Sequence, residues 1–184
     1  NLISAFTGIT SHTGGLTVSD TGSISAADLN MINTFKASGT TTATATSEIT
    51  GSAADIVTEI GLITHNVNVN FTITGVAATI AELKVLNAAT GGIIAISPGT
   101  IAQSYDDTAT NLAAAFDGIT TSTSTLTITG ATPATIAELM TINAATSGTV
   151  VLNPQTIAAN LSDTAVNLAA AFDGITTSTS TLTI

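Results

Sequence analysis

The chain has 184 residues, of which only 8% are charged, against about a quarter in an average soluble domain. Its net charge is −10, with Lys36 and Lys84 as its two cations, which excludes nucleic-acid binding and attraction to anionic lipid, because both depend on clustered Lys and Arg. The lack of cysteine excludes disulfide scaffolds and thiolate metal sites, and no apolar run approaches the length of a membrane span, so we expect no membrane insertion.

Tandem copies organise the chain. The sequence NLAAAFDGITTSTSTLTI at residues 111–128 recurs letter for letter at 167–184, a step of 56 residues. A looser copy, NLISAFTGITSHTGGLTV, occupies residues 1–18, and a divergent copy occupies 55–74. Self-similarity at a fixed period of this size is the signature of a repeat architecture. We therefore expect a partial repeat at 1–20, a divergent repeat at 21–74, and full repeats at 75–130 and 131–184.

The first helix of each repeat carries a capping-box signature. Thr79 and Glu82 have the spacing at which a hydroxyl and an acid satisfy each other's backbone amides. Apolar residues follow at helical intervals, and Gly91 predicts a left-handed exit from the helix. The same pattern recurs at Thr135, Ile136, Glu138, Leu139, Ile142 and Gly148, and more loosely at Ser25 and Asp28.

A second helix is predicted to start near Asp107 and Thr108, which are both good N-cap residues. Leu112 and Phe116 give this helix a narrow apolar stripe, and Gly118 predicts its end. Equivalent residues stand at Asp163, Thr164, Leu168, Phe172 and Gly174, and in the divergent repeat at Ser52, Asp55, Ile56, Ile60 and Gly61.

Strands are predicted between the helices. Residues 66–74 alternate strictly between apolar and polar side chains, which is typical of a strand with one buried face. Ser97-Pro98-Gly99 and Asn153-Pro154-Gln155 are typical of turns, so the segments 93–96 and 101–104 are predicted to pair as a hairpin. The repeat is then strand, helix, strand, strand, helix.

These elements predict an α/β fold arranged as a solenoid-like tandem repeat array. Each repeat is too small to bury a core alone, so neighbouring repeats must share one. We expect the following side chains to be buried between helix and sheet: Val69, Leu83, Leu112, Phe116, Leu126, Leu139, Leu168 and Phe172. Because Asn1 aligns with Asn111 inside the second helix, we also expect these residues to be a window of a longer repetitive polypeptide.

The sequence predicts no catalytic residues and no cofactor. Ser and Thr are abundant, but none has a base beside it as a nucleophile requires. His12 and His65 follow the second helix of their repeats, where later repeats have Thr or Ser. Without ligands near them in the sequence, we interpret both as solvated loop histidines. We therefore predict that the protein is not an enzyme.

Asp117 and Asp173 are the candidate metal ligands. Each directly precedes a glycine, and in a repeat array the two would align as a column of like charge. Calcium takes about six to eight oxygen ligands and could bridge such a column. The other repeated acids are accounted for by caps. We therefore treat calcium as a possible ligand with Asp117 and Asp173 as its candidate sites.

Threonines form a further pattern. Residues 121, 123, 125, 127 and 129 are all Thr, so one face of that strand is almost entirely threonine. Such a ladder could contact ice, and the plainer alternative is that Thr suits an exposed pleated surface.

The chain resembles a group of very long bacterial surface proteins. Residues 163–171 read DTAVNLAAA, and they follow TIAELMTINAATSGTV at 135–150; residues 51–56 read GSAADI. Tandem units of the DTAxNLAAA type are typical of long secreted or cell-surface repeat proteins, often cyanobacterial. The resemblance implies an extracellular location and a role as an adhesin, a surface layer, or a fibre tied to motility and biofilm.

We predict that the chain is a structural repeat segment of an extracellular or cell-surface fibre. It would associate with itself, head to tail, with residues 1–18 meeting 163–184. The alternative is the stalk or binding module of a bacterial adhesin, which would contact glycan, calcium or ice through its Thr-rich sheet faces.

Overall fold

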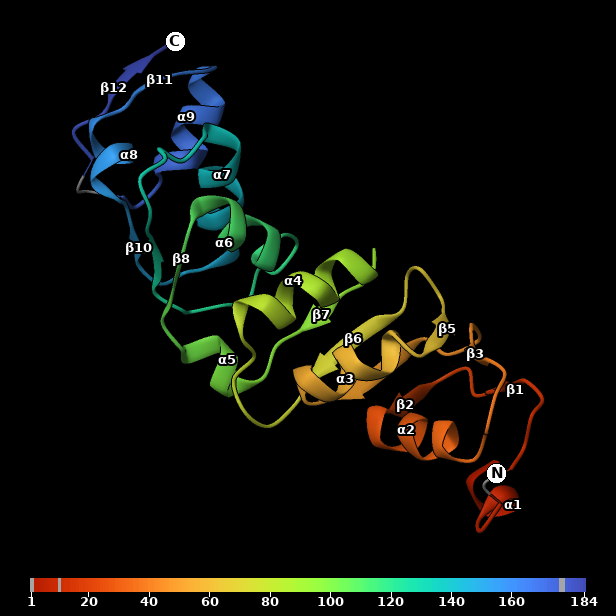
Figure 1. The fold of residues 1–184 in the computed structure, drawn as a ribbon. Coiled ribbons are helices and arrows are strands. Elements are labelled where there is room, and N and C mark those ends of the chain that lie inside the picture. Colours follow the sequence, from red (N-terminus) through yellow and green to blue (C-terminus); the bar gives the residue numbers. More distant parts are fainter. Residues whose placement is uncertain (1, 10, 176–177) are drawn as a thin grey trace.

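A computed structural model describes residues 2–9, 11–175 and 178–184. The chain is elongated, with its two termini at opposite ends, and it combines short helices with parallel strands (Figure 1). The predicted α/β class is therefore confirmed. Among the described helices, none combines the length and apolar character that crossing a membrane requires.

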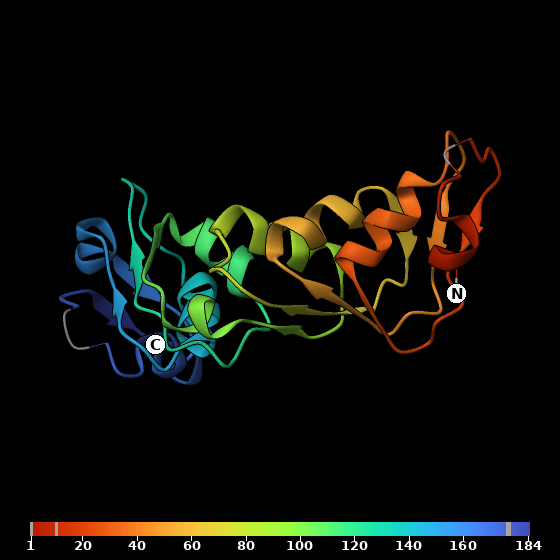
Figure 2. The same cartoon turned by 90° about the horizontal axis from the view of Figure 1, so that it is seen from below.

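The helices form a row. Seven of them contact one another in sequence: α1 (Leu2–Phe6), α2 (Ala26–Thr34), α3 (Ala53–Ile60), α4 (Ile80–Ala89), α6 (Ala109–Phe116), α7 (Ile136–Ala145) and α9 (Ala165–Phe172). Figure 2 shows α2, α3 and α4 (orange to yellow-green) side by side along one edge, with strands on the other. The five-residue helices α5 (Pro98–Ala102) and α8 (Pro154–Ala158) lie outside this row.

Strands pair in parallel across four small sheets. The first two sheets are β1 (Leu16–Thr17), β3 (Thr41–Ala43), β5 (Ile63–His65), and β2 (Ser23–Ser25), β4 (Glu48–Gly51), β6 (Asn70–Ile73), β7 (Ile94–Ala95). The other two are β8 (Tyr105–Asp107), β9 (Leu126–Ile128), β10 (Val150–Val151), and β11 (Asn160–Ser162), β12 (Thr181–Thr183). Paired residues lie 21 to 25 positions apart, as for Tyr105 with Leu126 and Ser23 with Glu48.

Two kinds of helix alternate in the row. We call α2, α4 and α7 the type-A helices; α4 and α7 carry a complete capping box, in which Thr79 and Glu82, or Thr135 and Glu138, satisfy each other. We call α3, α6 and α9 the type-B helices, and the N-cap of each is a single Ser or Thr: Ser52, Thr108 and Thr164. The step of 56 residues therefore spans one helix of each type.

The predicted left-handed exits are correct for α6 and α9 and wrong for the type-A helices and for α3, whose C-cap Gly61 has φ −73°. Gly118 and Gly174 have φ of +72° and +71°. Gly91 and Gly148 have no positive φ, and α4 ends at Thr90 in an extended conformation. A glycine is required at 148 for a different reason: a Cβ there would lie 2.3 Å from the Ser124 carbonyl oxygen.

The predicted hairpin is wrong. Pro98 is the first residue of α5, and the Ser97 hydroxyl caps that helix by accepting from the Thr100 amide. Residues 101 and 102 belong to the helix, β7 pairs with β6, and β8 pairs with β9, all in parallel. Proline is favoured in the first turn of a helix because its missing amide has no partner there.

The strand predicted at 66–74 is shorter than expected. Only Asn70–Ile73 is a strand, and Val67 is 72% exposed. The Asn66 side-chain oxygen accepts from the Asn68 amide, and the Asn66 carbonyl accepts from the Val69 amide. These bonds close a turn, so the buried alternation begins only at Val69.

One hydrophobic core runs through the described residues between the helix row and the strands. Seven of the eight predicted core residues are buried: Val69, Leu83, Leu112, Phe116, Leu126, Leu139 and Leu168. Phe172 is the exception, since it is only half-buried at the C-terminal end of the row. No described element packs on the far side of α9, which accounts for the difference.

Candidate functional site

Two pockets of about 240 Å³ each are related by the 56-residue repeat. Each lies where the end of a type-A helix meets the end of the following type-B helix. The first is lined by Asn87, Thr90, Gly91, Gly92, Ile94, Asp117, Gly118 and Ile119. The second is lined by Asn143, Thr146, Ser147, Gly148, Val150, Asp173, Gly174 and Ile175.

Beside each pocket, an asparagine of the type-A helix hydrogen-bonds to the C-terminal end of the type-B helix. The Asn87 side-chain amide donates to the carbonyls of Ala114 and Asp117, both at 3.0 Å. Asn143 donates to the carbonyls of Ala170 and Asp173, both at 2.9 Å. The last carbonyls of a helix lack partners within the helix, so these amides cap α6 and α9 from a neighbouring helix. The amide donors are thus engaged in holding the helix row together.

Asp117 and Asp173 line separate pockets. Both are exposed C-cap residues. Among the described residues, no group of three or more His, Cys, Asp and Glu could hold a metal ion. The structure therefore does not bring the two predicted ligands together, and calcium binding at either stays a prediction.

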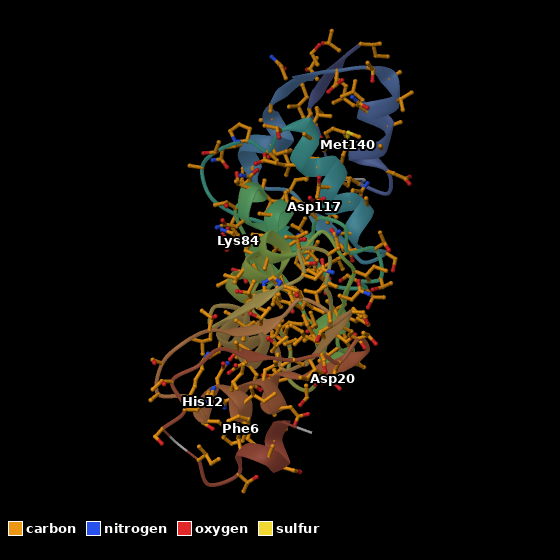
Figure 3. The ribbon with its side chains drawn as sticks, turned by 90° about the vertical axis from the view of Figure 1, so that its right-hand side faces the viewer. Phe6, His12, Asp20, Lys84, Asp117 and Met140 are labelled. Carbon is orange, nitrogen blue, oxygen red and sulfur yellow. The ribbon has the colours of Figure 1, made fainter. Side chains whose placement is uncertain are left out.

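The two histidines are half-buried rather than solvated. His12 forms a parallel bridge with Lys36, and its ring packs edge-on against Phe6 at 5.1 Å (Figure 3). His65 ends β5, and its Nδ1 lies 2.9 Å from the carbonyl oxygen of Asn66. The interpretation of both as solvated loop residues is therefore wrong in part: both side chains stay partly exposed, but His65 belongs to a strand and each ring packs against a phenylalanine, Phe6 or Phe71.

A buried carboxylate lies in the N-terminal half, and the sequence pattern did not predict it. Glu59 is 2% exposed and accepts from the Asn33 side-chain amide at 2.6 Å. The Asn33 oxygen accepts from Thr41, whose own hydroxyl oxygen accepts from Lys36. Burial raises the pKa of Glu59, and the bond from Asn33 opposes that rise. Asn33 occupies the position of Asn87 and Asn143, which was the one signal in the sequence.

A groove of about 500 Å³ lies over α4, α6 and α7, with Lys84 and Asp117 in its lining (Figure 3). The Lys84 ammonium donates to the Asn111 side-chain oxygen at 2.5 Å. The Asn111 amide donates to Asp107 at 2.7 Å, and this bond holds the pKa of Asp107 below its usual range. Met140 replaces Lys84 in the next repeat, so the groove has different chemistry there.

Glu138 links a type-B helix to the type-A helix that follows. It accepts from the Thr110 hydroxyl at 2.6 Å and from the Thr135 amide at 2.8 Å. Burial raises the pKa of Glu138, but these hydrogen bonds outweigh it, so its pKa lies below the usual value. Carboxylates here therefore serve as acceptors between and within helices.

The C-terminal end exposes apolar side chains that are buried inside the chain. We call the surface of α9 and β12 the C-terminal face. Leu182 is 45% exposed and Ile184 87% exposed, whereas their equivalents Leu126 and Ile128 are 0% and 2% exposed. β12 pairs only with β11 among the described strands, whereas β9 pairs with strands on both sides. This face offers both an apolar surface and a strand edge.

A scan against protein-family models and searches of curated proteins and of solved structures find no match to the chain.

Proposed function

We propose that the chain is a structural repeat segment of an extracellular or cell-surface fibre and assembles end to end with further copies. The observation that carries this proposal is the row of helices, in which each helix contacts the next one while the strands pair in parallel at steps of 21 to 25 residues. Exposed strand edges with apolar flanks are templates for pairing with another chain. A contact between opposite ends of identical molecules does not close on itself, so it produces a filament.

The interior supports a solenoid-like array. Strands pair in parallel at steps of 21 to 25 residues throughout, as for Leu16 with Thr41 and for Asn160 with Thr181. Successive helices contact only their neighbours in the row, apart from weaker contacts. An array whose units touch only adjacent units extends without limit in one direction, which suits a fibre. Hydrogen-bonded Thr, Ser and Asn side chains supply the polar contacts in place of charge.

The proposed lack of catalysis rests on the hydrogen bonding of the polar side chains, and the proposed location rests on the resemblance. Several of the polar side chains are engaged in capping, as for Asn87 and Glu138. The resemblance to bacterial surface repeat proteins supports an extracellular or cell-surface location. We include in the proposal that the chain is not an enzyme.

The second candidate is the stalk or binding module of an adhesin. Thr17, Thr42 and Thr64 are in register across three parallel strands. Thr50 and Thr72 are in register on the neighbouring sheet. Rows of hydroxyls at the strand spacing of about 4.8 Å could bind glycan or ice. Calcium at Asp117 or Asp173 belongs to this candidate.

Self-association tests the proposal. Sedimentation velocity and electron microscopy measure the size of the assemblies that the chain forms over a range of concentrations. We expect filaments whose amount rises with concentration, and we expect Leu182→Lys to abolish them. Val76→Lys is the matched control, because Val76 is 77% exposed and lies outside the C-terminal face. Monodisperse monomers of the unaltered chain at high concentration would refute the fibre and favour the adhesin stalk.

A further inference from the structure

We propose that Lys84 and Asn111 form an amide cross-link, in which the side-chain nitrogen of Lys84 replaces the side-chain nitrogen of Asn111. Asp107 is the catalytic residue that carries a proton to the nitrogen that leaves. The three residues belong to α4, α6 and β8 of one chain, and the structure shows them before the bond forms. The inference does not depend on assembly into a fibre.

The attacking nitrogen lies beside the carbonyl group that it joins. The Lys84 ammonium donates to Asn111 Oδ1 at 2.5 Å, between residues 27 positions apart in the sequence. Because a carbonyl bond is about 1.2 Å long, Lys84 Nζ lies no more than about 3.7 Å from Asn111 Cγ. Atoms poised to react are about 3–3.5 Å apart. A small movement of the two side chains therefore brings the nitrogen to the carbon.

The orientation of the Asn111 amide is fixed by its two partners. An ammonium only donates hydrogen bonds and a carboxylate only accepts them, so Oδ1 faces Lys84 and Nδ2 faces Asp107. Asn111 Nδ2 donates to Asp107 Oδ1 at 2.7 Å. The Thr108 amide donates to the same oxygen at 2.7 Å and holds the carboxylate in place. Asp107 thus contacts the nitrogen that has to leave.

The reaction balances in atoms and charge. Lys84 gives one proton to the ionised Asp107, and the neutral amine attacks Asn111 Cγ and forms the new C–N bond. The bond between Cγ and Nδ2 then breaks. Nδ2 takes up the proton held by Asp107 and one proton from the attacking nitrogen, and it leaves as ammonium. Asp107 is ionised again, and the chain has acted on itself once, so the proposal that it is not an enzyme stands.

The next repeat contains the same amide and carboxylate without the amine. Asn167 Nδ2 donates to Asp163 Oδ1 at 2.9 Å. Met140 stands at the position that Lys84 occupies one repeat earlier (Figure 3). The Asn–Asp pair therefore belongs to the start of the type-B helix in both repeats. Lys84 is the addition that makes one of the two pairs reactive.

The other lysine is not placed to react. Lys36 Nζ donates to the Thr41 hydroxyl at 2.8 Å, and Thr41 donates to Asn33 Oδ1 at 2.6 Å. The Asn33 amide also donates to a carboxylate, that of Glu59. The Thr41 hydroxyl, however, separates the amine from the amide carbonyl. We therefore expect a cross-link at Lys84 and none at Lys36.

Trypsin tests the cross-link, because Lys36 and Lys84 are the two residues after which it can cut this sequence. A lysine whose side chain has become an amide carries no charge and is not cut. The full chain is folded, then denatured and digested. We expect cleavage after Lys36 and none after Lys84, and an intact mass below the sequence mass by one ammonia. Cleavage after both lysines, with the full sequence mass, would overturn the inference.

Peptide mapping identifies the two residues that are joined. An asparagine also loses ammonia when it closes to a cyclic imide with its own backbone, so mass alone does not locate the bond. A protease that cuts before aspartate separates Lys84 from Asn111, because Asp106 and Asp107 lie between them. We expect one branched peptide that contains both residues. Loss of ammonia with two separate peptides would overturn the inference.

Lys84→Arg is the matched variant, since arginine keeps the positive charge and the hydrogen-bond donors but stays protonated and does not attack the amide. We expect the variant to have its full sequence mass and to be cut by trypsin after residue 84. Its melting temperature should fall, because the loop between positions 27 residues apart is no longer closed. Lys36→Arg is the control and should retain the cross-link; its loss there would contradict the assignment to Lys84.

Asp107→Asn tests the proton carrier. We expect this variant to keep its helix content by circular dichroism and to be cut by trypsin after Lys84. Asp163→Asn changes the equivalent residue of the next repeat and should leave the cross-link in place. Equal cross-linking in the two variants would mean that Asp107 only orients the helix start, and it would overturn the catalytic role.

Discussion

Residues 111–128 and 167–184 are the same sequence in two environments, and they separate what local sequence determines from what neighbours determine. In both copies the type-B helix ends at a phenylalanine, Phe116 or Phe172. A glycine with positive φ lies two residues later in each. Burial differs: Leu126 is 0% exposed and Leu182 is 45% exposed. Local structure is therefore repeated with the sequence, whereas the core belongs to the contact between adjacent segments.

A fragment of one repeat gives the strongest test of this difference. We expect residues 79–134 to be largely unfolded, because β7 loses its partner β6 and β9 loses its partner β10. The fragment would then have uncovered faces at both ends, which neighbouring segments cover in the full chain. Circular dichroism during thermal unfolding measures this. A monomeric fragment with a cooperative melt near that of the whole chain would instead show independent domains.

The two phenylalanines sharpen the comparison within the folded chain. Phe116→Ala should lower the free energy of unfolding by about 3–5 kcal/mol, as for a fully buried aromatic residue. Phe116 also packs edge-on against Tyr105, with ring centroids 5.4 Å apart. Phe172→Ala should cost distinctly less, because Phe172 is half-buried. Urea unfolding followed by circular dichroism measures both variants. Equal losses would contradict the view that neighbours create the core.

The helices and their caps could be predicted from sequence because they depend on neighbours in the chain. The capping boxes at Thr79 and Thr135 and the caps at Thr108 and Thr164 need residues only three positions away. The apolar patterns of the predicted helices and strands also placed seven of the eight predicted core residues correctly. The α/β class followed from these local signals together with the repeat.

Other features could not be predicted, because their partners lie a whole strand-to-strand step away. Asn87 is an ordinary exposed-face residue until α6 lies beside it, 27 to 30 positions further on. Glu59 depends on Asn33, 26 positions earlier. The hairpin prediction failed at Ser97-Pro98 for a different reason: the same letters suit both a turn and the first turn of a helix. Long-range pairing decided between them.

The asparagines that cap α6 and α9 should contribute equally in the two repeats, in contrast to the phenylalanines. Asn87→Ala and Asn143→Ala should each lower the free energy of unfolding by about 1 kcal/mol, because two helix-end carbonyls lose a donor at a partly solvated site. The geometry is nearly the same at both positions. Asn30→Ala is the matched control, since Asn30 is an exposed asparagine in α2. Urea unfolding is the measurement, and a loss at Asn30 as large as at Asn87 would contradict the capping role.

The smallest effect concerns the divergent repeat, where Glu59 stands in place of Ala115. Burial raises the pKa of Glu59; the bond from Asn33 lowers it, nearby Asp55 raises it, and Lys36 lowers it. Above the raised folded pKa, the carboxylate is ionised in both states, and its burial opposes folding. As the pH falls through the folded pKa toward the unfolded value of about 4.3, the folded state takes up a proton and this penalty disappears.

Glu59→Gln should therefore raise the free energy of unfolding near neutral pH, because the glutamine oxygen still accepts from Asn33 without carrying a charge. The gain over the unaltered chain should shrink as the pH falls through the folded pKa of Glu59 and vanish below the unfolded value. Asp106→Asn is the control, because Asp106 is an exposed acid in β8. Urea unfolding of all three chains from neutral pH to about pH 4 measures the effect. A gain that stays constant across this range would mean that glutamine acts through packing and not by removing a buried charge.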